Sequence, residues 1–389
     1  MMNKNKVKIL YISTQPLTVN TSSTIRNKAL LKGFLLNKIQ VDILVFKNGK
    51  FVIEKYNEHI SHHTNNFSTK KINFRNGLNN NLLVKKLKIK IYRSISRRRV
   101  YDKYYKQINN LEWTKNLAEY THIISSSDPK SSHKLASQIK EKYPQILWVQ
   151  IWGDPWTNDI TQDRTKVLKK INIEEKKLLT ASDFIFYVSD LTLEKQKEIF
   201  PELSHKMYST FIPFLRRNES QNKKIKNNGK LTFLYAGDYN SNIRNIKPLY
   251  DSFLRTEHKL VICGNSDINL QCTENITIIP RIEENELKKI ERNSDVLIHL
   301  SNLKGTQIPG KIYQYSGTTK PIIFLLDGNF EAIYNLFNRF NRYIFCYNNK
   351  ESISSLLLKK EEFKETKVVE EFSPQIVVKN ILLAIAKNK

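Results

Sequence analysis

The sequence predicts an α/β protein of two domains, each built on a mostly parallel β-sheet. The chain has 389 residues, more than one hydrophobic core usually accommodates, and 40% of them are hydrophobic. Within the first 46 residues a predicted strand, loop, helix and second strand follow one another, which is the order of a βαβ unit. The same order restarts after the polar, charged residues 215–230, so we expect the domain boundary there.

Six strands are predicted in the first domain. They cover residues 6–13, 41–46, 122–127, 147–152, 181–189 and 207–214, and the predicted helices between them cover 24–36, 130–143, 174–180 and 191–200. Residues 48–80 are polar, and we assign no structure to them. The first loop contains no glycine, so it lacks the Gly-x-Gly-x-x-Gly signature of dinucleotide-binding proteins. A nicotinamide or flavin enzyme is therefore not expected.

The second domain repeats the alternation of strands and helices. Its predicted strands cover 230–237, 259–264, 276–279, 293–300, 321–326 and 342–347. Its predicted helices begin near 244 and near 309, and cover 284–293, 328–337 and 350–359. An amphipathic helix at 372–387 ends the chain and should pack on or between the domains. We therefore divide the chain into residues 1–214, a linker 215–230, residues 231–371 and a C-terminal segment 372–389.

Residues 305–321 form the candidate ligand-binding loop of the second domain. They follow a predicted buried strand, and ligands of such sheets bind beyond the carboxyl ends of the strands. Gly305 and Gly310 allow a close backbone approach, and the start of the next helix would offer unpaired N–H groups to a diphosphate. Lys311 adds a positive charge there, and Gln314 lies one helical turn further on the same side. The alternative is an ordinary loop before a surface helix.

His133 and Asp154 are the candidate functional residues of the first domain. His133 lies at the start of a predicted helix, and Asp154 directly follows the predicted strand 147–152. Both positions belong to the edge of a parallel sheet where ligands bind. A capping or surface role is the alternative for His133, and we favour it slightly. A turn at Asp154-Pro155 is the alternative for Asp154, but there we favour function.

The net charge of +27 favours association with anionic surfaces, although a general bias towards Lys and Asn contributes to it. Basic residues concentrate at 84–106, where Leu87, Ile91 and Ile95 recur at helical spacing. A basic amphipathic helix suits an anionic membrane surface. Equally, it could pack its apolar side on its own domain. A nucleic-acid partner is not expected, because no outward row of aromatic side chains is evident.

Cysteine content and hydropathy indicate where the chain resides. Its three cysteines lack the spacing of a metal site and fit a reducing compartment. No apolar run is long enough to span a bilayer, and residues 1–12 read as a first strand instead of a secretory signal. We expect a cytoplasmic protein, held at the inner face of the membrane if residues 84–106 bind lipid.

Five short motifs carry a resemblance to a known family. They are Ser125-Ser-Ser-Asp-Pro-Lys-Ser-Ser-His133, Trp152-Gly-Asp-Pro-Trp156, Leu234-Tyr-Ala-Gly-Asp-Tyr-Asn240, Ser294-Asp-Val-Leu-Ile-His-Leu300 and Pro309-Gly-Lys-Ile-Tyr-Gln-Tyr315. In this order they resemble the retaining glycosyltransferases of the GT-B fold, and among these glycosyltransferase family 4. The resemblance covers nearly the whole chain. It implies two Rossmann-like domains that face each other across a cleft.

The resemblance also implies a substrate and a set of site residues. The donor would be a nucleotide-diphosphate sugar, UDP- or GDP-linked, and no metal or cofactor would be needed. The implied donor-binding residues are Gly237, Arg244, Thr306, Pro309, Gly310, Lys311 and Gln314. Arg244 and Lys311 would stabilise the departing diphosphate, while Asp154 and His133 would act on the acceptor side. The acceptor would be a saccharide, lipid-linked in surface-polysaccharide assembly.

Three departures from the family pattern leave alternatives open. The family places acidic residues at the positions of Thr306 and Gln314, and it has a basic residue near the position of Asp238. The departures at Thr306 and Gln314 favour a catalytically silent subunit that binds a partner enzyme. A nucleotide-sugar epimerase of the same fold is a further alternative.

Overall fold

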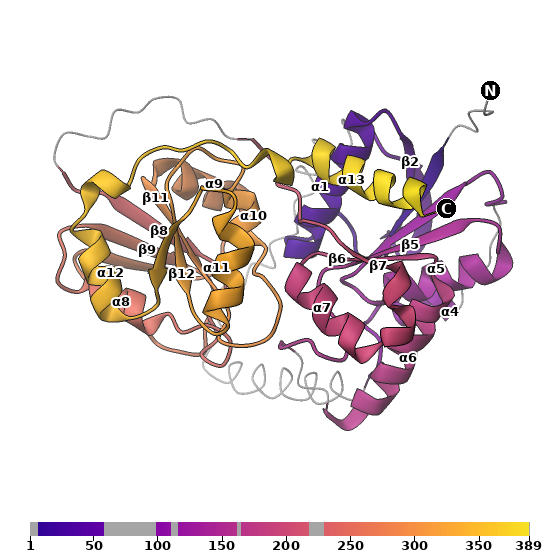
Figure 1. Ribbon diagram of the computed structural model, residues 1–389, viewed down its shortest axis with the longest axis horizontal. Helices are drawn as coiled ribbons and strands as arrows, with labels where there is room; N and C mark the ends of the chain where they lie inside the picture. The colour runs from indigo at the N-terminus through magenta and orange to yellow at the C-terminus, as the bar shows by residue number, and fades with distance from the viewer. Residues whose placement is uncertain (1–6, 58–98, 110–115, 162–164, 218–228, 389) are drawn as a thin grey trace, which may run out of the picture. The chain divides into compact units, whose positions relative to one another are not determined.

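The computed structural model describes residues 7–57, 99–109, 116–161, 165–217 and 229–388, and these form two compact units. The first unit comprises Met1–Val188 and Gln196–Ser209, and the second comprises Ser189–Lys195 and Thr210–Lys389. Each unit contains one sheet with helices around it (Figure 1). The division of the chain at residues 214 and 231 stays a prediction.

The first unit has a seven-stranded sheet in the order β3-β2-β1-β4-β5-β6-β7. Its strands are β1 (Lys8–Ser13), β2 (Gln40–Lys47), β3 (Lys50–Lys55), β4 (His122–Ser126), β5 (Leu147–Trp152), β6 (Phe184–Tyr187) and β7 (Met207–Ser209). Every pairing is parallel except that of β2 with β3. Its helices are α1 (Ser22–Leu36), α4 (Tyr105–Asn109), α5 (Ser131–Lys142) and α6 (Leu168–Ala181), while α7 (Asp190–Ile199) is divided between the units.

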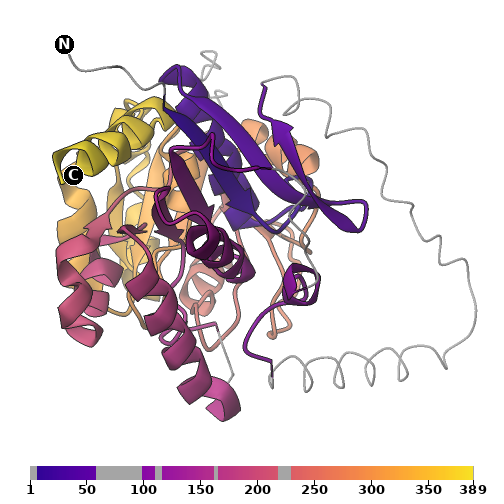
Figure 2. The ribbon, with the colours of Figure 1, turned by 90° about the vertical axis from the view of Figure 1, so that its right-hand side faces the viewer.

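Strand β3 is an addition to the predicted elements. It forms a hairpin with β2 at one edge of the sheet (Figure 2). The turn contains Asn48 and Gly49, both with positive φ angles of 50° and 82°. An Asn-Gly pair between two apolar segments is a strong hairpin signal, and the polar composition of the surrounding residues concealed it.

The second unit has a six-stranded parallel sheet in the order β10-β9-β8-β11-β12-β13. Its strands are β8 (Thr232–Ala236), β9 (Lys259–Cys263), β10 (Ile276–Ile279), β11 (Val296–Leu300), β12 (Ile322–Leu326) and β13 (Ile344–Tyr347). Its helices are α8 (Lys247–Phe253), α9 (Glu284–Asn293), α10 (Lys311–Tyr315), α11 (Phe330–Asn338), α12 (Lys350–Leu357) and α13 (Pro374–Lys387). Helices α8 and α12 lie together on one face of the sheet, and α9, α10 and α11 on the other (Figure 1).

Runs of fully buried residues form the central strands of both sheets. Every residue of β4, β11 and β12 is buried, as expected for parallel strands covered by helices on both faces. Local caps start the helices: the side chains of Thr21, Asn349 and Ser373 accept hydrogen bonds at the first turns of α1, α12 and α13. The predicted twofold repetition of strands and helices is confirmed.

Most of the predicted basic helix lies outside the described residues, which resume at residue 99. The part that is described packs on the first unit. Tyr101 and Tyr104 are buried, and the Tyr101 hydroxyl donates a hydrogen bond to Glu174 at 3.1 Å. For residues 101–106 the packing alternative therefore holds, but the predicted helix is wrong for residues 99–104, because the chain is helical only from Tyr105, where α4 begins. Of the helices in the described ranges, none combines the length and apolarity needed to cross a membrane.

Candidate functional site

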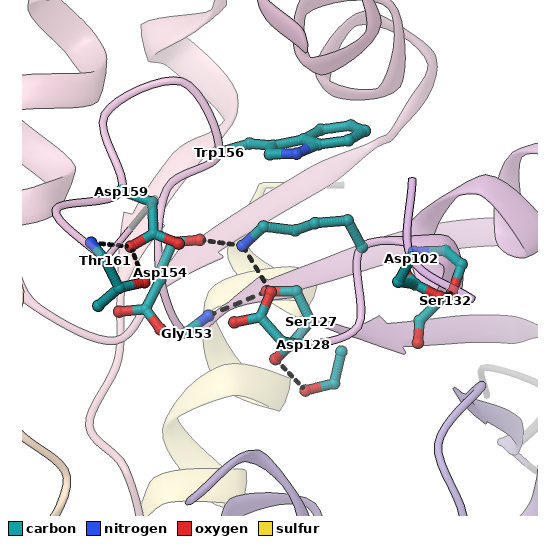
Figure 3. A network of polar contacts seen from close by, with 12 residues as sticks. Asp102, Ser127, Asp128, Ser132, Gly153, Asp154, Trp156, Asp159 and Thr161 are labelled. Carbon is teal, nitrogen blue, oxygen red and sulfur yellow. Dashed lines mark hydrogen bonds and ion pairs between the residues drawn. The ribbon is translucent and has the colours of Figure 1, made fainter. Parts of the chain in front are cut away.

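The predicted site residues of the first unit follow the carboxyl ends of β4 and β5. Parallel strands end at a common edge, so the loops that follow them collect there. The β4 loop leads into α5, and the β5 loop contains Gly153 and Asp154. Figure 3 shows Ser127, Asp128, Gly153 and Asp154 gathered around one lysine side chain.

That lysine is Lys130, which the sequence analysis did not select. Its side chain is 5% exposed. The ammonium lies 2.8 Å from the Asp128 carboxylate and donates to the backbone oxygen of Asp154 at 2.6 Å. Burial alone would lower the pKa of Lys130, but the carboxylates of Asp128, Asp154 and Asp159 outweigh it and raise the pKa. A permanent cation therefore joins the two loops.

Glu175 of α6 binds the backbone of the loop that follows β5. Its buried carboxylate accepts hydrogen bonds from the backbone N–H of Trp156 at 2.9 Å and of Thr157 at 2.8 Å. The Thr157 hydroxyl donates a third at 2.5 Å. Burial raises the pKa of Glu175, although these hydrogen bonds oppose the shift. Glu175 thus fixes the backbone next to Asp154, and its position within a helix gave no sequence signal for this role.

His133 is fully buried, so a surface role for it is excluded. Its Nδ1 lies 2.8 Å from the Ser125 hydroxyl, and its ring centroid lies 4.3 Å from that of Trp152. Its Nε2 has no hydrogen-bond partner among the described residues. Burial, Lys130 and Arg26 together hold the pKa of His133 well below its ordinary value. The imidazole is therefore neutral, and its proposed action on the acceptor stays a prediction.

In the second unit, Arg244 and Gly237 come together at the ends of β8 and β11. The Arg244 guanidinium donates from Nε to the Asn302 side-chain oxygen at 3.0 Å and from Nη1 to the Asp238 backbone oxygen at 2.5 Å. A Cβ added to Gly237 would lie 3.7 Å from Nη1, so the two residues are neighbours. Asp238, found where the family has a basic residue, is paired with Arg281 at 2.5 Å.

Lys311 has a carboxylate partner that the sequence analysis missed. Its ammonium lies 2.7 Å from the Glu291 carboxylate of α9 and 5.3 Å from the centroid of the Tyr315 ring. The predicted helix after Pro309 and Gly310 is confirmed, but α10 contains only five residues. A diphosphate at Lys311 would compete with Glu291 for the ammonium.

Gln314 contacts the segment that precedes the predicted linker. Its side-chain oxygen accepts from the Leu215 N–H at 2.9 Å, and its amide nitrogen donates to the Pro213 oxygen at 3.0 Å. A glutamate could make only the first of these bonds, which gives a structural reason for glutamine here. Gly317 supports the same contact, because a Cβ there would lie 2.7 Å from the Arg216 oxygen.

Thr306 is bound to the beginning of α7. Its backbone oxygen accepts hydrogen bonds from the hydroxyls of Ser189 at 3.2 Å and Thr192 at 3.1 Å. The Thr306 and Thr192 hydroxyls also lie 3.1 Å apart. The preceding Gly305 has a φ of 81°, which favours glycine. Thr306 thus has a structural role in this loop, where an acidic residue would face the Thr192 hydroxyl.

Within the described ranges, no group of three or more His, Cys, Asp or Glu side chains is arranged to hold a metal ion.

Comparison with known proteins shows similarity at the level of structure. No protein-family model and no curated protein matches the sequence. A solved glycosyltransferase from Rickettsia africae superimposes with a TM-score of 0.53 at 12% identity, covering 99% of each chain. An alpha-glucosyltransferase in complex with UDP and a DNA 13-mer gives 0.54 at 12% identity, covering 97% of this chain and 99% of that one. A UDP-N-acetylglucosamine 2-epimerase from Rickettsia bellii gives 0.48 at 13% identity, covering 98% and 96%, a score too low to support an argument. The chain therefore has the two-sheet α/β fold of GT-B glycosyltransferases.

Proposed function

We propose that this chain is a glycosyltransferase that moves a sugar from a nucleotide-diphosphate sugar to a saccharide acceptor. The observation that carries the proposal is the Arg244 guanidinium, held beside Gly237 at the carboxyl edge of the second sheet by Asn302 and Asp238. Two neighbours with TM-scores above 0.5 are a glycosyltransferase and a UDP-bound alpha-glucosyltransferase. Their superposition supports the fold, and because the identity is only 12% the activity remains our inference.

In this proposal, the second unit stabilises the leaving group. As the anomeric carbon separates from the diphosphate, negative charge grows on the diphosphate oxygen, and a fixed cation lowers the energy of that state. Arg244 supplies a rigid guanidinium fork, and Lys311 supplies a second cation once Glu291 yields to the diphosphate. We further propose family 4 membership, a retaining outcome and no need for a metal.

The first unit would orient the acceptor hydroxyl. The backbone of Asp154 is bound by Lys130, and Glu175 binds the N–H groups of Trp156 and Thr157 that follow it. Such double support keeps a reacting group within the narrow geometry that efficient transfer requires. A lipid-linked acceptor of surface-polysaccharide assembly would account for the basic residues 84–98, which lie outside the described residues.

Nucleotide binding tests this proposal. UDP or GDP should raise the melting temperature of the protein, and Arg244→Gln should weaken that nucleotide about tenfold or more, since it removes a charged hydrogen-bond donor. Hydrolysis or transfer from the matching nucleotide sugar should fall in the same variant. Arg255, an exposed arginine after α8, gives the matched control Arg255→Gln. Nucleotide binding that is absent, or unchanged in Arg244→Gln, would contradict the proposal.

One observation favours a second candidate, a catalytically silent subunit of the same fold. Thr306, Lys311 and Gln314 all bind other groups of the protein in the described structure. If these contacts persist, the loop is a structural element and the chain binds a partner enzyme. Nucleotide binding without any turnover of UDP- or GDP-sugars would favour this candidate. Conversion of a UDP-sugar into its epimer would indicate the third alternative.

A further inference from the structure

Arg26 of α1 is a buried cation at the carboxyl edge of the first sheet. Its side chain is 4% exposed. Its Nη2 lies 3.4 Å from the Ser126 hydroxyl at the end of β4. Its Nη1 lies so close to Gly153, after β5, that an added Cβ would be 2.0 Å away. The guanidinium therefore lies against the residue that precedes Asp154.

Arg26 lacks a carboxylate partner among the described residues. A guanidinium has five N–H bonds to donate, and the contact with Ser126 is long for a hydrogen bond. Its Nε has no partner within the described part of the chain. A buried charge without a partner of opposite charge lowers the stability of the folded state. Such a cation is expected to have an anionic partner that is not part of the described chain.

The side chains that share hydrogen bonds with Ser126, beside Arg26, are neutral and rich in hydroxyl groups. Asn27 accepts from the Ser126 hydroxyl at 2.7 Å and from the Tyr11 hydroxyl at 3.0 Å, and it donates to the Ser13 hydroxyl at 3.2 Å. This network fixes Ser126 without bringing a negative charge to the guanidinium. The neighbouring cation Lys130 differs, because it is paired with Asp128 at 2.8 Å. Of these two buried cations, Arg26 is the one without a carboxylate partner in the described part of the chain.

We propose that Arg26 anchors a subsite for an oxyanion, a phosphate or carboxylate group carried by the acceptor. Calling this group part of the acceptor rests on the proposed glycosyltransferase function, whereas the anion site itself does not. The planar fork of arginine matches such groups with paired hydrogen bonds. Arg26 lies against Gly153, and Asp154 is the next residue in the chain. An anion bound to Arg26 would therefore fix the acceptor close to the proposed catalytic carboxylate of Asp154.

Binding of inorganic phosphate and of acetate to the protein tests the subsite, with saturating UDP present to occupy the second unit. We expect phosphate to raise the melting temperature of the wild type. Arg26→Gln should weaken phosphate about tenfold or more, and Arg26→Lys should weaken it less, since the charge is kept and the fork is lost. Arg99→Gln, at an exposed arginine of the same unit, should behave like the wild type. A response to acetate as well would extend the site to carboxylates.

Two outcomes overturn the proposal: no response of the wild type to either anion, or an undiminished response in Arg26→Gln. Without anions, Arg26→Gln should be at least as stable as the wild type, because an unpaired buried charge is removed. If that variant fails to fold, Gly153→Ala replaces it, since its Cβ would displace the guanidinium and should abolish the phosphate response. UDP binding is scored separately. Its absence beside Arg26-dependent phosphate binding would refute the donor assignment and leave the subsite standing.

Discussion

Replacing Glu291 by glutamine should tighten the binding of UDP or GDP if Lys311 contacts the diphosphate. The Lys311 ammonium lies 2.7 Å from the Glu291 carboxylate, and the two side chains are 29% and 22% exposed. Partly exposed ion pairs are worth about 0–1 kcal/mol in net terms, far less than the bare Coulomb attraction. Freeing the ammonium should therefore strengthen nucleotide binding by up to about 1 kcal/mol, or roughly fivefold. Isothermal titration calorimetry measures the dissociation constant directly.

Three further variants make this test decisive. Lys311→Ala should weaken the nucleotide, and adding Glu291→Gln to it should then have no effect, because the competition has no target. Lys288→Gln, which removes a partner of Glu284 on the same helix, should leave binding unchanged. If Glu291→Gln and Lys311→Ala both bind nucleotide as the wild type does, Lys311 is a structural residue. That result would favour the catalytically silent subunit.

The remaining predictions concern groups that fix the loops. Glu175→Gln should lower the free energy of unfolding by about 1–3 kcal/mol, because one of the Trp156 or Thr157 N–H groups then faces an amide nitrogen; chemical denaturation measures it, and an unchanged value would show that the loop does not depend on the carboxylate. The pH dependence follows from the same group. Burial raises the pKa of Glu175 above its ordinary value of 4.5. Between pH 4.5 and the raised pKa, the carboxyl group keeps its proton in the folded state and has lost it in the unfolded state. Stability should therefore fall as pH rises from 4.5 through the raised pKa, and denaturation curves of Glu175→Gln should lack this component. Gln314→Glu should cost about 1–3 kcal/mol, because a carboxylate would meet the Pro213 oxygen in place of an amide donor; equal midpoints in urea for the two proteins would refute the contact.

The strands and helices of both units could be predicted from the sequence, because buried strands appear in it as short segments rich in apolar residues. Strands β11 and β12 are almost entirely apolar, β4 contributes the apolar pair Ile123 and Ile124, and each strand is followed by a polar or glycine-containing loop. Alternation of such segments with helices admits few arrangements other than a parallel sheet. The position of Asp154 and Arg244 near strand ends follows from that alternation alone.

The partners of Lys311 and Gln314 were not predictable, since they come from more distant parts of the chain. Lys311 and Glu291 are 20 residues apart, and Gln314 reaches Pro213 across 101 residues. Glu175 looks like any exposed helical glutamate until the fold brings the β5 loop over it. A motif can identify a residue type at a strand end, but the residue's pairing depends on packing between segments.

The two units differ in what a ligand must displace. In the second unit, Lys311 is paired with Glu291 and Arg244 already donates to Asn302 and Asp238. A nucleotide can gain only the difference between its contacts and those it replaces. At Arg26 in the first unit, no described carboxylate has to be displaced. An anion there removes an existing burial penalty, so much of its interaction energy is available for binding. Under the proposed function, a charged group on the acceptor would therefore contribute more affinity per contact than the diphosphate of the donor, and the charge of the acceptor is the first property to vary in a substrate search.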